Sequence, residues 1–410
     1  MSQTETNGSV ESDVERPAEA TTLNEMQPLN RERATGRAKK LLGQLDGAGA
    51  IVATHPANVR WLTGLAAPGH IHYGNTPLFA VAGPDELVRL VAANADLAWL
   101  VEAWDESAIH TYGRFVYSGE SGHLRREART VGSALKEALE ESGAGQVIAL
   151  DNRAPWQTVA DLTEDIRPRN LISAGGAFYL ARRNKDRDEV ALLRRVNLIA
   201  EDALLQGISA LRTGITEQKI MTVIQQRMID AGARPRLGSV GFGANGALVD
   251  TWPSSRQLRR GDIVRFDIGC ESCGYHADIA RTVAFGTAET WSVDSYRALL
   301  AGQQAALGEV RPGVHAAALF ETAVAVTRRS GLNDYDRSHC GHGIGLEIYE
   351  PPLLAPSDTD SLEEGMTLCI ETPLYEVGRA GLQIEDAVLV TASGFEYLGK
   401  ADRDLFLVDA

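Results

Sequence analysis

Residues 264–283 read Val-Arg-Phe-Asp-Ile-Gly-Cys-Glu-Ser-Cys-Gly-Tyr-His-Ala-Asp-Ile-Ala-Arg-Thr-Val, and they set two carboxylates inside apolar, strand-like segments. Asp267 and Asp278 are eleven residues apart, and the turn-forming residues Ser272 and Gly274 stand between them. We therefore expect a β-hairpin that brings the two acids across from each other. Strand positions that face a core rarely hold carboxylates, because an unpaired buried charge costs several kcal/mol. Two such acids in one hairpin indicate a functional site.

Three further segments repeat the pattern of a ligating side chain in apolar or glycine-rich surroundings. His342 lies in Cys340-Gly-His-Gly-Ile-Gly345, Glu371 lies in Leu368-Cys-Ile-Glu-Thr-Pro373, and Glu385 lies in Gly381-Leu-Gln-Ile-Glu-Asp386. We expect these side chains to converge with the two acids of the hairpin on one point of the fold. The alternative is that each acid is an independent surface residue or a member of a separate salt bridge.

The charge of this group predicts a metal centre. Its four carboxylates and one neutral imidazole carry a charge of −4, which two divalent cations would neutralise. Without metal, clustered carboxylates would repel one another or take up protons. Oxygen ligands with one imidazole suit Mn, Co, Fe or Zn better than Cu or a sulfur cluster. The sequence therefore predicts a centre of two divalent metal ions held by Asp267, Asp278, His342, Glu371 and Glu385.

Hydrophobic periodicity predicts strands and helices on both sides of these segments. Before residue 184 the expected strands are 50–53, 78–82, 87–91 and 147–150, and the expected helices are 31–46 and 123–141. After it we expect a helical stripe from Val190, a helix from the N-cap Thr216 to Gly232, helices 294–310 and 315–329, and strands 263–268, 279–285, 367–370 and 382–391. The pattern predicts two domains of α+β or α/β type, over residues 31–184 and 185–410.

Composition limits the classes of protein to consider. The chain has 410 residues, 44% hydrophobic and 23% charged, which is typical of a folded globular protein. A net charge of −15 argues against nucleic acid and anionic lipid as partners, and no apolar run approaches the roughly 18 residues of a membrane span. Residues 1–30 hold six acids and one arginine, and we expect them to form a disordered acidic tail. Four cysteines without a secretory signal favour the cytoplasm.

Several common catalytic motifs are absent from the sequence. It contains no G-x-x-x-x-G-K-[ST], H-E-x-x-H or G-x-S-x-G segment. Residues 241–246 match G-x-G-x-x-G, but residues 248–253 (Leu-Val-Asp-Thr-Trp-Pro) open a helix poorly. A dinucleotide site needs a helix at that point, so we do not expect one.

The five residues stand in the order Asp, Asp, His, Glu, Glu, in D-x-G, D-I-x-R-T, G-H-G-I-G, I-E-x-P and I-E-D contexts. This set resembles the pita-bread metallopeptidase superfamily, which comprises methionine aminopeptidase, aminopeptidase P, prolidase and creatinase. The resemblance covers about residues 183–398 and implies an α+β fold with a pita-bread catalytic domain. The segment Pro56-Ala-Asn-Val-Arg-Trp-Leu-Thr-Gly64 resembles the additional α/β amino-terminal domain of the prolidase, aminopeptidase P and creatinase branch. That branch usually forms homodimers, so the resemblance also implies a homodimer.

The resemblance implies a role for each ligand. Asp267 would bind one metal, Asp278 and Glu385 would bridge both metals, and His342 and Glu371 would complete the other. Glu371 is also implied to take the proton from the attacking water. The implied reaction is hydrolysis of an amide bond in a small peptide or an amino-acid-derived substrate, most like that of an Xaa-Pro dipeptidase or aminopeptidase.

The residues around the metal ligands depart from the peptidase pattern. Peptidases of this group have a histidine seventeen residues before the first ligand and another seven residues after the ligand histidine; here those positions hold Asp250 and Tyr349. A third histidine is displaced by one residue, to His339, with Ser338 in its place. Proline-specific members often have an arginine where this chain has Gln383.

These departures leave more than one function open. In the first, Asp250, Tyr349 and His339 act with Glu371 as catalytic residues on a peptide-like amide. In the second, the protein acts on a non-peptide small molecule, as an amidase, amidinohydrolase or lyase. In the third, it is a binding module without catalysis; such modules usually lose ligands, and all five are present here.

Weaker candidates complete the predicted site. We expect Gln383 and His276 to bind substrate, and we expect the same of His70 and His72, because their glycine-flanked segment resembles a loop that borders a partner's active site. Cys369 lies two residues before Glu371, on the same strand face. The four cysteines are interpreted as small buried hydrophobic residues, with a thiol switch of metal affinity as the alternative.

Overall fold

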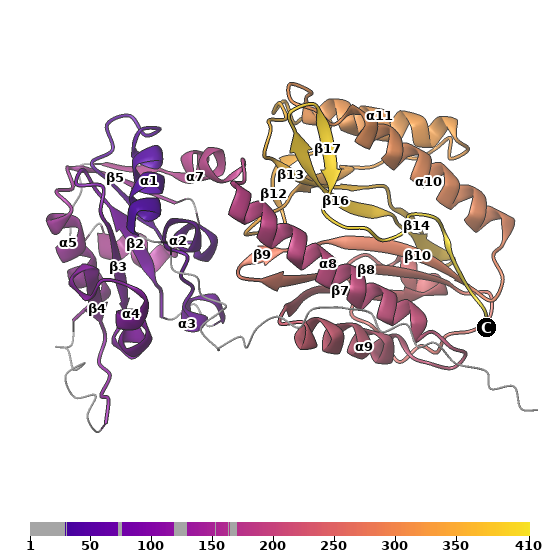
Figure 1. The fold of residues 1–410 in the computed structure, drawn as a ribbon, viewed down its shortest axis with the longest axis horizontal. Coiled ribbons are helices and arrows are strands. Elements are labelled where there is room, and N and C mark those ends of the chain that lie inside the picture. The colour runs from indigo at the N-terminus through magenta and orange to yellow at the C-terminus, as the bar shows by residue number, and fades with distance from the viewer. Residues whose placement is uncertain are drawn as a thin grey trace, which may run out of the picture.

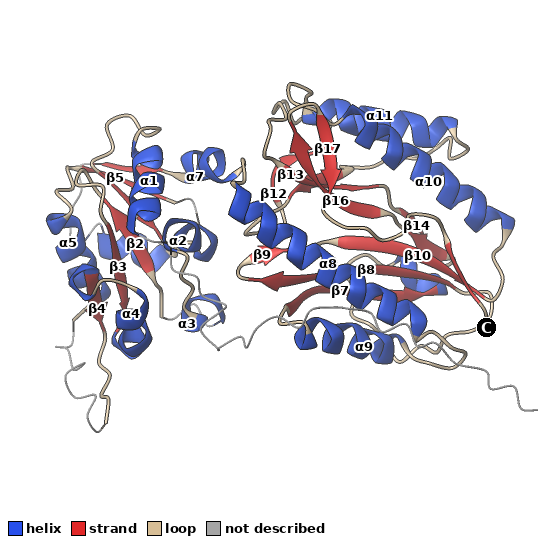
Figure 2. Ribbon diagram, in the orientation of Figure 1, coloured by secondary structure: helices blue, strands red, loops and turns tan. Residues whose placement is uncertain are grey.

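The structure is a computed structural model that describes Leu29 and residues 31–72, 76–118, 129–151, 153–162, 164 and 170–410. The expected acidic tail therefore lies outside the described residues, apart from Leu29. Two β-sheets dominate the described chain, one built from residues before 174 and the other from residues after 233 (Figure 1 and Figure 2). Helices lie against both sheets, so the fold mixes helix and sheet as expected.

The first sheet has the strand order β4-β3-β2-β1-β5-β6. Its strands are β1 (Ala50–Ala53), β2 (Phe79–Ala82), β3 (Val88–Ala93), β4 (Ile109–Tyr112), β5 (Val147–Leu150) and β6 (Asn170–Ser173). Within β1, Ile51 packs in one hydrophobic core and Val52 packs in another. Because successive side chains of a strand point to opposite faces, this sheet is covered on both sides.

Helices form the two layers that cover the first sheet. The core around Ile51 receives side chains from α1 (Arg31–Leu42) and α2 (Pro56–Thr63), and the core around Val52 receives side chains from α5 (Val131–Glu141). The shorter helices of this part are α3 (Pro68–His72), α4 (Leu97–Ala103) and α6 (Trp156–Asp161). The arrangement is the expected α/β type.

The sequence predicted the elements of this part with shifted ends. Strands 50–53 and 147–150 are observed as predicted, and strand 87–91 is observed as Val88–Ala93. The helix expected to end at residue 46 ends at Leu42, before Gly43. The helix expected over 123–141 begins at Val131, because the side chain of Thr130 caps it by accepting a hydrogen bond from the Ser133 backbone at 3.1 Å. Residues 119–128 lie outside the described residues.

Two helices connect the sheets, α7 (Gly175–Arg182) and α8 (Arg187–Ser209). A capping box starts α8: the Asp186 side chain accepts from the Glu189 backbone at 3.0 Å, and the Glu189 side chain accepts from the Asp186 backbone at 2.9 Å. The apolar stripe of this helix is buried at Leu193, Val196, Ala200 and Ala203. The predicted domain boundary at residue 184 falls between these helices and stays a prediction.

The second sheet has ten strands, with the main order β12-β11-β13-β16-β10-β8-β7. These strands are β7 (Arg234–Phe242), β8 (Ile263–Ser272), β10 (Ile279–Phe285), β11 (Gly341–Gly343), β12 (Glu350–Leu353), β13 (Thr367–Glu371) and β16 (Glu385–Thr391). Three strands pair at its sides: β9 (Tyr275–His276), β17 (Gly394–Tyr397) and β18 (Phe406–Val408). A separate two-stranded sheet consists of β14 (Leu374–Glu376) and β15 (Ala380–Leu382).

Two helix pairs cover different parts of the second sheet (Figure 1). Helix α8 and α9 (Glu217–Asp230) share a hydrophobic core with β7, β8 and β10. Helices α10 (Thr290–Glu309) and α11 (Ala316–Arg329) share another core with β13 and β16. None of the described helices is long and apolar enough to cross a membrane.

Most elements of this part were predicted, but details of pairing were not. Thr216 caps α9 as expected, by accepting from the Lys219 backbone at 3.2 Å. The helix expected from residue 294 begins at Thr290, and the strand expected over 382–391 begins at Glu385. The β8–β10 hairpin is confirmed, but its register differs: Asp267 lies opposite Ala280, so Asp278 is offset by two residues. The two acids are therefore diagonal neighbours and do not face each other directly.

Candidate metal centre

Strand alternation directs the acids to the face of the sheet opposite the helices. Phe266 and Ile268 of β8 pack in the core with α8 and α9, so Asp267 between them points to the other face. Likewise Ile370 of β13 packs in the core with α10 and α11, and Glu371 points away from it. Because side chains alternate along each strand, the apolar residues face the helices and the acids lie together on the other face of the sheet.

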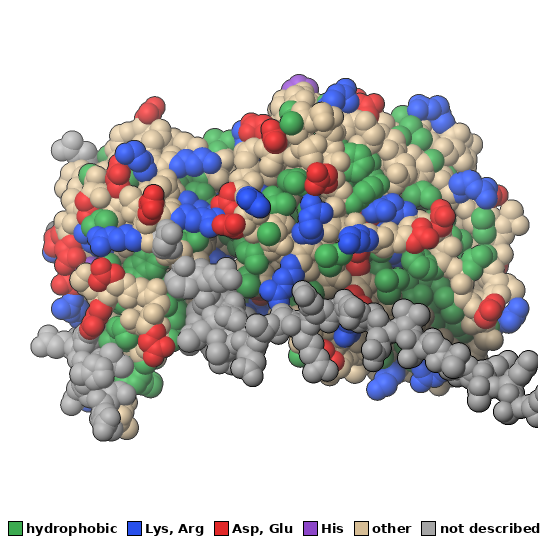
Figure 3. All heavy atoms as spheres, viewed as in Figure 1, with side chains coloured by type: hydrophobic (Ala, Val, Ile, Leu, Met, Phe, Trp, Pro, Cys, Tyr) green, Lys and Arg blue, Asp and Glu red, His purple; other side chains and the backbone are tan. Residues whose placement is uncertain are grey.

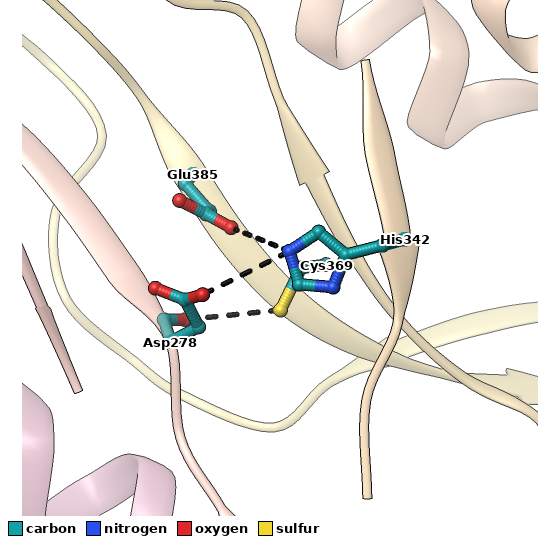
Figure 4. A group of neighbouring side chains, drawn as sticks. All are labelled: Asp278, His342, Cys369 and Glu385. Atoms are coloured by element: carbon teal, nitrogen blue, oxygen red, sulfur yellow. Dashed lines mark hydrogen bonds and ion pairs between the residues drawn. The ribbon is translucent and has the colours of Figure 1, made fainter. Parts of the chain in front are cut away.

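Three of the predicted ligands point toward one another (Figure 4). His342 of β11 places Nε2 at 3.8 Å from Oδ2 of Asp278, which directly precedes β10, and at 3.7 Å from Oε1 of Glu385 in β16. Together with Sγ of Cys369, one ligand atom from each residue lies within 4.8 Å of the others. All four side chains are buried.

Glu371 and Asp267 join this group through a chain of hydrogen bonds. Glu371 lies directly opposite Glu385 in the β13–β16 pair, and Nε2 of Gln383 donates to Oε2 of each glutamate at 3.2 Å. Nη1 of Arg265 donates to Oδ2 of Asp267 at 2.9 Å and to Oε1 of Gln383 at 2.8 Å. The five side chains thus lie together, and their role as metal ligands stays a prediction.

Arg265 is a residue of this centre that the sequence analysis missed. It is completely buried, and it also donates to the Gly246 carbonyl at 2.8 Å, the Ser239 hydroxyl at 2.9 Å and the Leu248 carbonyl at 3.2 Å. Its position two residues before Asp267 on one strand puts both side chains on the same face, and that spacing was the available signal. Arg265 therefore brings one fixed positive charge to the carboxylates.

Two buried oxygens in the centre have no hydrogen-bond partner among the described residues. Oδ1 of Asp278 and Oε1 of Glu385 accept no hydrogen bond from any described residue. An unsatisfied buried acceptor costs about 1–3 kcal/mol, so such atoms call for a ligand. Carboxylate oxygens with one imidazole are a donor set that suits Mn, Fe, Co or Zn. The residues present therefore fit a divalent metal ion.

The acidity of the carboxyl groups agrees with that fit. Burial, and then the neighbouring carboxylates, raise the pKa of Asp278 and of Glu385 well above the ordinary values. Burial also raises the pKa of Asp267 to about 6, although the adjacent Arg265 opposes the rise. A cation placed among these groups would favour their ionised forms. Full ionisation of the cluster therefore requires more positive charge than Arg265 supplies.

His342 is held in the form that binds metals. Its Nδ1 lies 3.0 Å from the Gly343 carbonyl, which can accept only from a protonated Nδ1, so Nε2 offers its lone pair to the carboxylate side. Burial lowers the pKa of His342, which favours the neutral ring. The ring of Tyr349 stacks on it, with centroids 3.7 Å apart and planes at 20°. Tyr349 is half exposed, so its other face is open to solvent.

His339 contacts the predicted base. Its Nε2 lies 3.2 Å from Oε1 of Glu371, and the Ser338 hydroxyl lies 3.0 Å from its Nδ1. Burial alone would raise the pKa of Glu371, but the hydrogen bond from His339 and the nearby positive charges lower it. The structure thus places the displaced histidine where it keeps Glu371 ionised.

Asp250 lies on the exposed loop after Leu248 and has φ of +51°. Its negative charge adds to burial and to the neighbouring acids in raising the pKa of Asp267 and Asp278, so it lies near them. Asp250 thus borders the centre from the solvent side.

Two glycines make room for the ligand strands. A Cβ on Gly269 would lie 2.3 Å from the Ala277 carbonyl oxygen, just before Asp278. Gly341 has φ of +141°, and a Cβ there would lie 2.2 Å from the Cys369 carbonyl oxygen. The glycines of the D-x-G and G-H-G motifs are therefore required by close backbone approach.

The other predicted substrate-binding residues lie outside this cluster. His276 is on β9, where its backbone donates to the Gly345 carbonyl at 2.9 Å and its buried Nδ1 has no partner among the described residues. His70 is buried in the first part of the chain, near Thr54 and Asp151, and burial lowers its pKa to about 4. The side chain of His72 lies outside the described residues.

The cysteines agree in part with the packing interpretation, because Cys270, Cys340 and Cys369 are buried whereas Cys273 is partly exposed. None of the four forms a disulfide, and Cys369 lies on the ligand face as its strand position implied. Burial raises the pKa of Cys369 well above the ordinary value and raises those of Cys270 and Cys340 to about 12. Thiols of this acidity react slowly, which favours the packing interpretation over a redox switch.

Surface charge on the face shown in Figure 3 is mixed. Lysine and arginine side chains are interspersed with aspartate and glutamate side chains over both parts of the described chain.

Comparison with known proteins places this geometry in a family. Residues 191–392 match the metallopeptidase family M24. The Xaa-Pro dipeptidase of Lactobacillus helveticus is 33% identical over 305 residues, which cover 67% of this chain and 83% of that protein. The Xaa-Pro dipeptidase of Pyrococcus furiosus is 31% identical over 223 residues, covering 54% of this chain and 64% of that protein.

A solved structure extends the similarity to both sheets. The Xaa-Pro dipeptidase from Bacillus anthracis superposes with a TM-score of 0.80 and 22% identity, covering 92% of this chain and 100% of that one. At that identity the likeness establishes the pita-bread fold. The chain spans about two thirds of the length of the first curated relatives it matches. The family match and the Lactobacillus relative together show that the chain belongs to the metallopeptidase family M24.

Proposed function

We propose that the protein is a dinuclear metal-dependent peptidase that hydrolyses the amide bond of an Xaa-Pro dipeptide or a related short substrate. The convergence of Asp278, His342 and Glu385, with two buried oxygens left without partners, carries this proposal. Its relatives support the proposal, because the similar proteins of Pyrococcus furiosus and Lactobacillus helveticus are Xaa-Pro dipeptidases. Asp267 and Glu371 would complete the ligand set.

The protein's own residues supply the acid–base chemistry around the metals. Two divalent cations in such a centre lower the pKa of a bound water and polarise the substrate carbonyl. Glu371 is buried beside His339, and against the effect of burial the hydrogen bond from His339 lowers its pKa, so its carboxylate can accept a proton from the attacking water. The same proton must then reach the leaving nitrogen, and His339 at 3.2 Å from Glu371 is placed to share in that transfer.

Three further residues complete the site in this proposal, two by contacting the substrate and one by orienting the ligands. Burial and the surrounding carboxylates raise the pKa of Tyr349, so its hydroxyl stays protonated at neutral pH and can donate to a substrate oxygen. Gln383 fixes the orientation of Glu371 and Glu385 by donating to both. Asp250 borders the open side of the centre, where it can attract a substrate ammonium group.

An activity panel tests this function directly. Protein loaded with Mn²⁺, Co²⁺, Fe²⁺ or Zn²⁺ would be assayed against Xaa-Pro dipeptides, longer Xaa-Pro peptides, and cyclic or methylated amino-acid derivatives. The proposal expects turnover of the dipeptides with at least one of these metals. Absence of hydrolysis of every peptide by fully loaded protein would contradict it.

A second candidate function is hydrolysis of a non-peptide amide or amidine. Three features of the site differ from the peptidase pattern and favour this candidate. Asp250 and Tyr349 occupy the positions of two family histidines, and Gln383 occupies a position where proline-specific members often have arginine. The buried cation beside Asp267 is instead Arg265. Turnover of a cyclic or methylated derivative without turnover of Xaa-Pro peptides would select this candidate or a lyase. Metal binding below one ion per chain, with no turnover at all, would select a binding module.

Three finer features belong to the same proposal. Manganese is the metal we expect, because the donor set is mostly carboxylate. A homodimer is expected from the amino-terminal part, whose fold is shared with the Bacillus anthracis dipeptidase. The cytoplasm is expected because none of the four cysteines forms a disulfide.

A further inference from the structure

Arg337 is a cation at the metal centre that the described protein leaves without a partner. It lies two residues before His339 and five before His342. Its Nε is buried and has no hydrogen-bond partner, and its guanidinium forms no ion pair with any described residue. Arg337 as a whole is half-buried, and a buried arginine donor without an acceptor is rare. An acceptor from outside the chain would satisfy it.

The Arg337 side chain is held in place by an aromatic platform. Its Cζ lies 5.2 Å from the ring centroid of Tyr375, and Cζ of Arg265 lies 5.3 Å from the same centroid. Arg265 is completely buried in its hydrogen bonds, so it fixes the position of the Tyr375 ring. Cation–π contacts of this kind orient a guanidinium without using its hydrogen-bond donors. Arg337 thus keeps its donors free for a ligand.

The segment that carries Arg337 is anchored as well. The Asp336 side chain accepts from the Arg337 backbone at 3.1 Å and forms an ion pair with Arg328 at 3.6 Å. Nε of Arg328 also donates to the Tyr335 carbonyl at 2.6 Å. Asp336 is therefore engaged with α11 and with the backbone, and it forms no pair with the Arg337 guanidinium.

Arg337 faces both the metal centre and an open groove. The Tyr375 ring that holds Arg337 also contacts Arg265, which donates to Asp267 at 2.9 Å, so the Arg337 guanidinium lies beside the centre. Its charge is also among the causes that lower the pKa of Glu371. A groove of about 480 Å³, lined by residues 331–337 and 373–375, opens beside it. Both walls of the groove continue into the centre, one through His339 and the other through Glu371.

We propose that Arg337 binds a carboxylate of the substrate, close to the amide bond that is cleaved. A guanidinium matches a carboxylate with two parallel hydrogen bonds, which a neutral amide cannot form. The substrate class is then a dipeptide or an N-acyl amino acid, whose free carboxylate lies next to the scissile bond. A longer peptide has no carboxylate at that distance. This proposal rests on the proposed function and narrows it from a general Xaa-Pro peptidase to a dipeptidase.

A matched pair of substrates tests the role of Arg337. An Xaa-Pro dipeptide and its carboxy-terminal amide would be compared by kcat/KM, using Mn²⁺-loaded wild type, Arg337→Met, Arg337→Lys and the control Arg297→Met, which changes an exposed arginine of α10. We expect wild type and the control to prefer the acid. We expect Arg337→Met to lose about ten- to a hundredfold of that preference, because kcat/KM should fall more for the acid than for the amide. The preference of Arg337→Lys for the acid should lie between those of wild type and Arg337→Met, because lysine keeps the charge but cannot form the two parallel hydrogen bonds.

Equal loss on both substrates would overturn the proposal, because Arg337 would then act only on Glu371. Equal hydrolysis of acid and amide by wild type would also overturn it, while leaving the proposed function in place. If neither substrate is hydrolysed, the proposed function fails. Calorimetric titration of the acid and the amide into the same proteins then tests whether Arg337 binds the carboxylate. Tighter binding of the acid by wild type, lost in Arg337→Met, supports the carboxylate site; equal binding of acid and amide refutes it.

Discussion

Arg265 and Asp267 are two residues apart on one strand, and the guanidinium of the first donates to the carboxylate of the second at 2.9 Å inside the sheet. The pair joins the first predicted metal ligand to Gln383 and, through it, to Glu371 and Glu385. Arg265 therefore acts as a permanent cation in a centre that would otherwise hold four carboxylates. With two divalent ions and one hydroxide added, the charges of the centre sum to zero.

Substitution Arg265→Met tests this role. The metal-free variant should lose roughly 3–5 kcal/mol of stability, because Asp267 and Gln383 lose a buried partner. Its metal affinity should rise, because one competing positive charge is gone. The increase in melting temperature on addition of Mn²⁺ should therefore be larger in the variant than in wild type. An equal increase in both would show that Arg265 does not compete with metal for the carboxylates.

Glu371→Gln tests the proposed proton acceptor. The amide is nearly isosteric and cannot accept the proton, so we expect kcat to fall by about 10²- to 10⁴-fold with the fold retained. Glu364→Gln, on an exposed residue of the preceding loop, serves as the control and should have full activity. Circular dichroism and the melting temperature would verify that both variants fold. Full activity in Glu371→Gln would exclude this carboxylate as the base.

Tyr349 offers a test that separates packing from chemistry. Tyr349→Phe keeps the ring that stacks on His342 and removes the hydroxyl, so kcat should fall by about 10²-fold while metal affinity is unchanged. Tyr349→Ala removes the stack as well and should also weaken metal binding. Titration calorimetry with Mn²⁺ and steady-state kinetics would measure the two effects. Unchanged kcat in the phenylalanine variant would restrict Tyr349 to holding His342.

Glu350 links the loop after His342 to the connection between the sheets, and it predicts a pH dependence of stability. Its buried carboxylate pairs with Lys185 at 2.9 Å and with Arg182. Burial alone would raise the pKa of Glu350, but the two cations outweigh it and hold the pKa at about 2. Because the folded pKa lies below the ordinary value, the ion pairs stabilise the protein fully above pH 4.5, and the stabilisation is lost as pH falls toward 2.

The variant Glu350→Gln measures that contribution. We expect the free energy of unfolding at neutral pH to fall by roughly 3–5 kcal/mol, because Arg182 and Lys185 remain buried without a counter-charge. The difference from wild type should shrink as the pH is lowered below 4.5. Glu347→Gln is the control, since Glu347 is a less buried partner of Arg182 and should matter less. A difference that does not change with pH would contradict the ion-pair account.

The sequence predicted the positions of the metal centre better than its surroundings. Asp267, Glu371 and Glu385 could be found because a carboxylate in an apolar strand is conspicuous, and strand alternation then fixes the face on which it lies. The predicted register of the β8–β10 hairpin was wrong by two residues, because the tight turn is formed by Cys273 and Gly274, which both have positive φ, rather than by residues centred on Ser272.

Other parts of the site depend on contacts between distant segments. Arg265 looks like an ordinary strand residue until β16 brings Gln383 to it, 118 residues later in the chain. Arg337 gains its role only where β14 places Tyr375 beneath its guanidinium. His70 was expected to border the active site of a partner subunit; it lies in the first part of the chain, hydrogen-bonded to Thr54, and its role at such a site stays a prediction. The roles of these two arginines depend on contacts between segments that are far apart in the chain, and the local sequence pattern does not contain that information.

The metal content of the purified protein tests the proposed metal centre most directly. Wild-type protein and Asp278→Asn would be reconstituted with Mn²⁺, dialysed, and measured by inductively coupled plasma mass spectrometry. We predict between one and two ions per wild-type chain and a clear loss in the variant, because Asp278 belongs to the buried cluster and is one of the two carboxylates expected to bridge the metals. Less than one ion per wild-type chain, or equal content in the two proteins, would contradict the account.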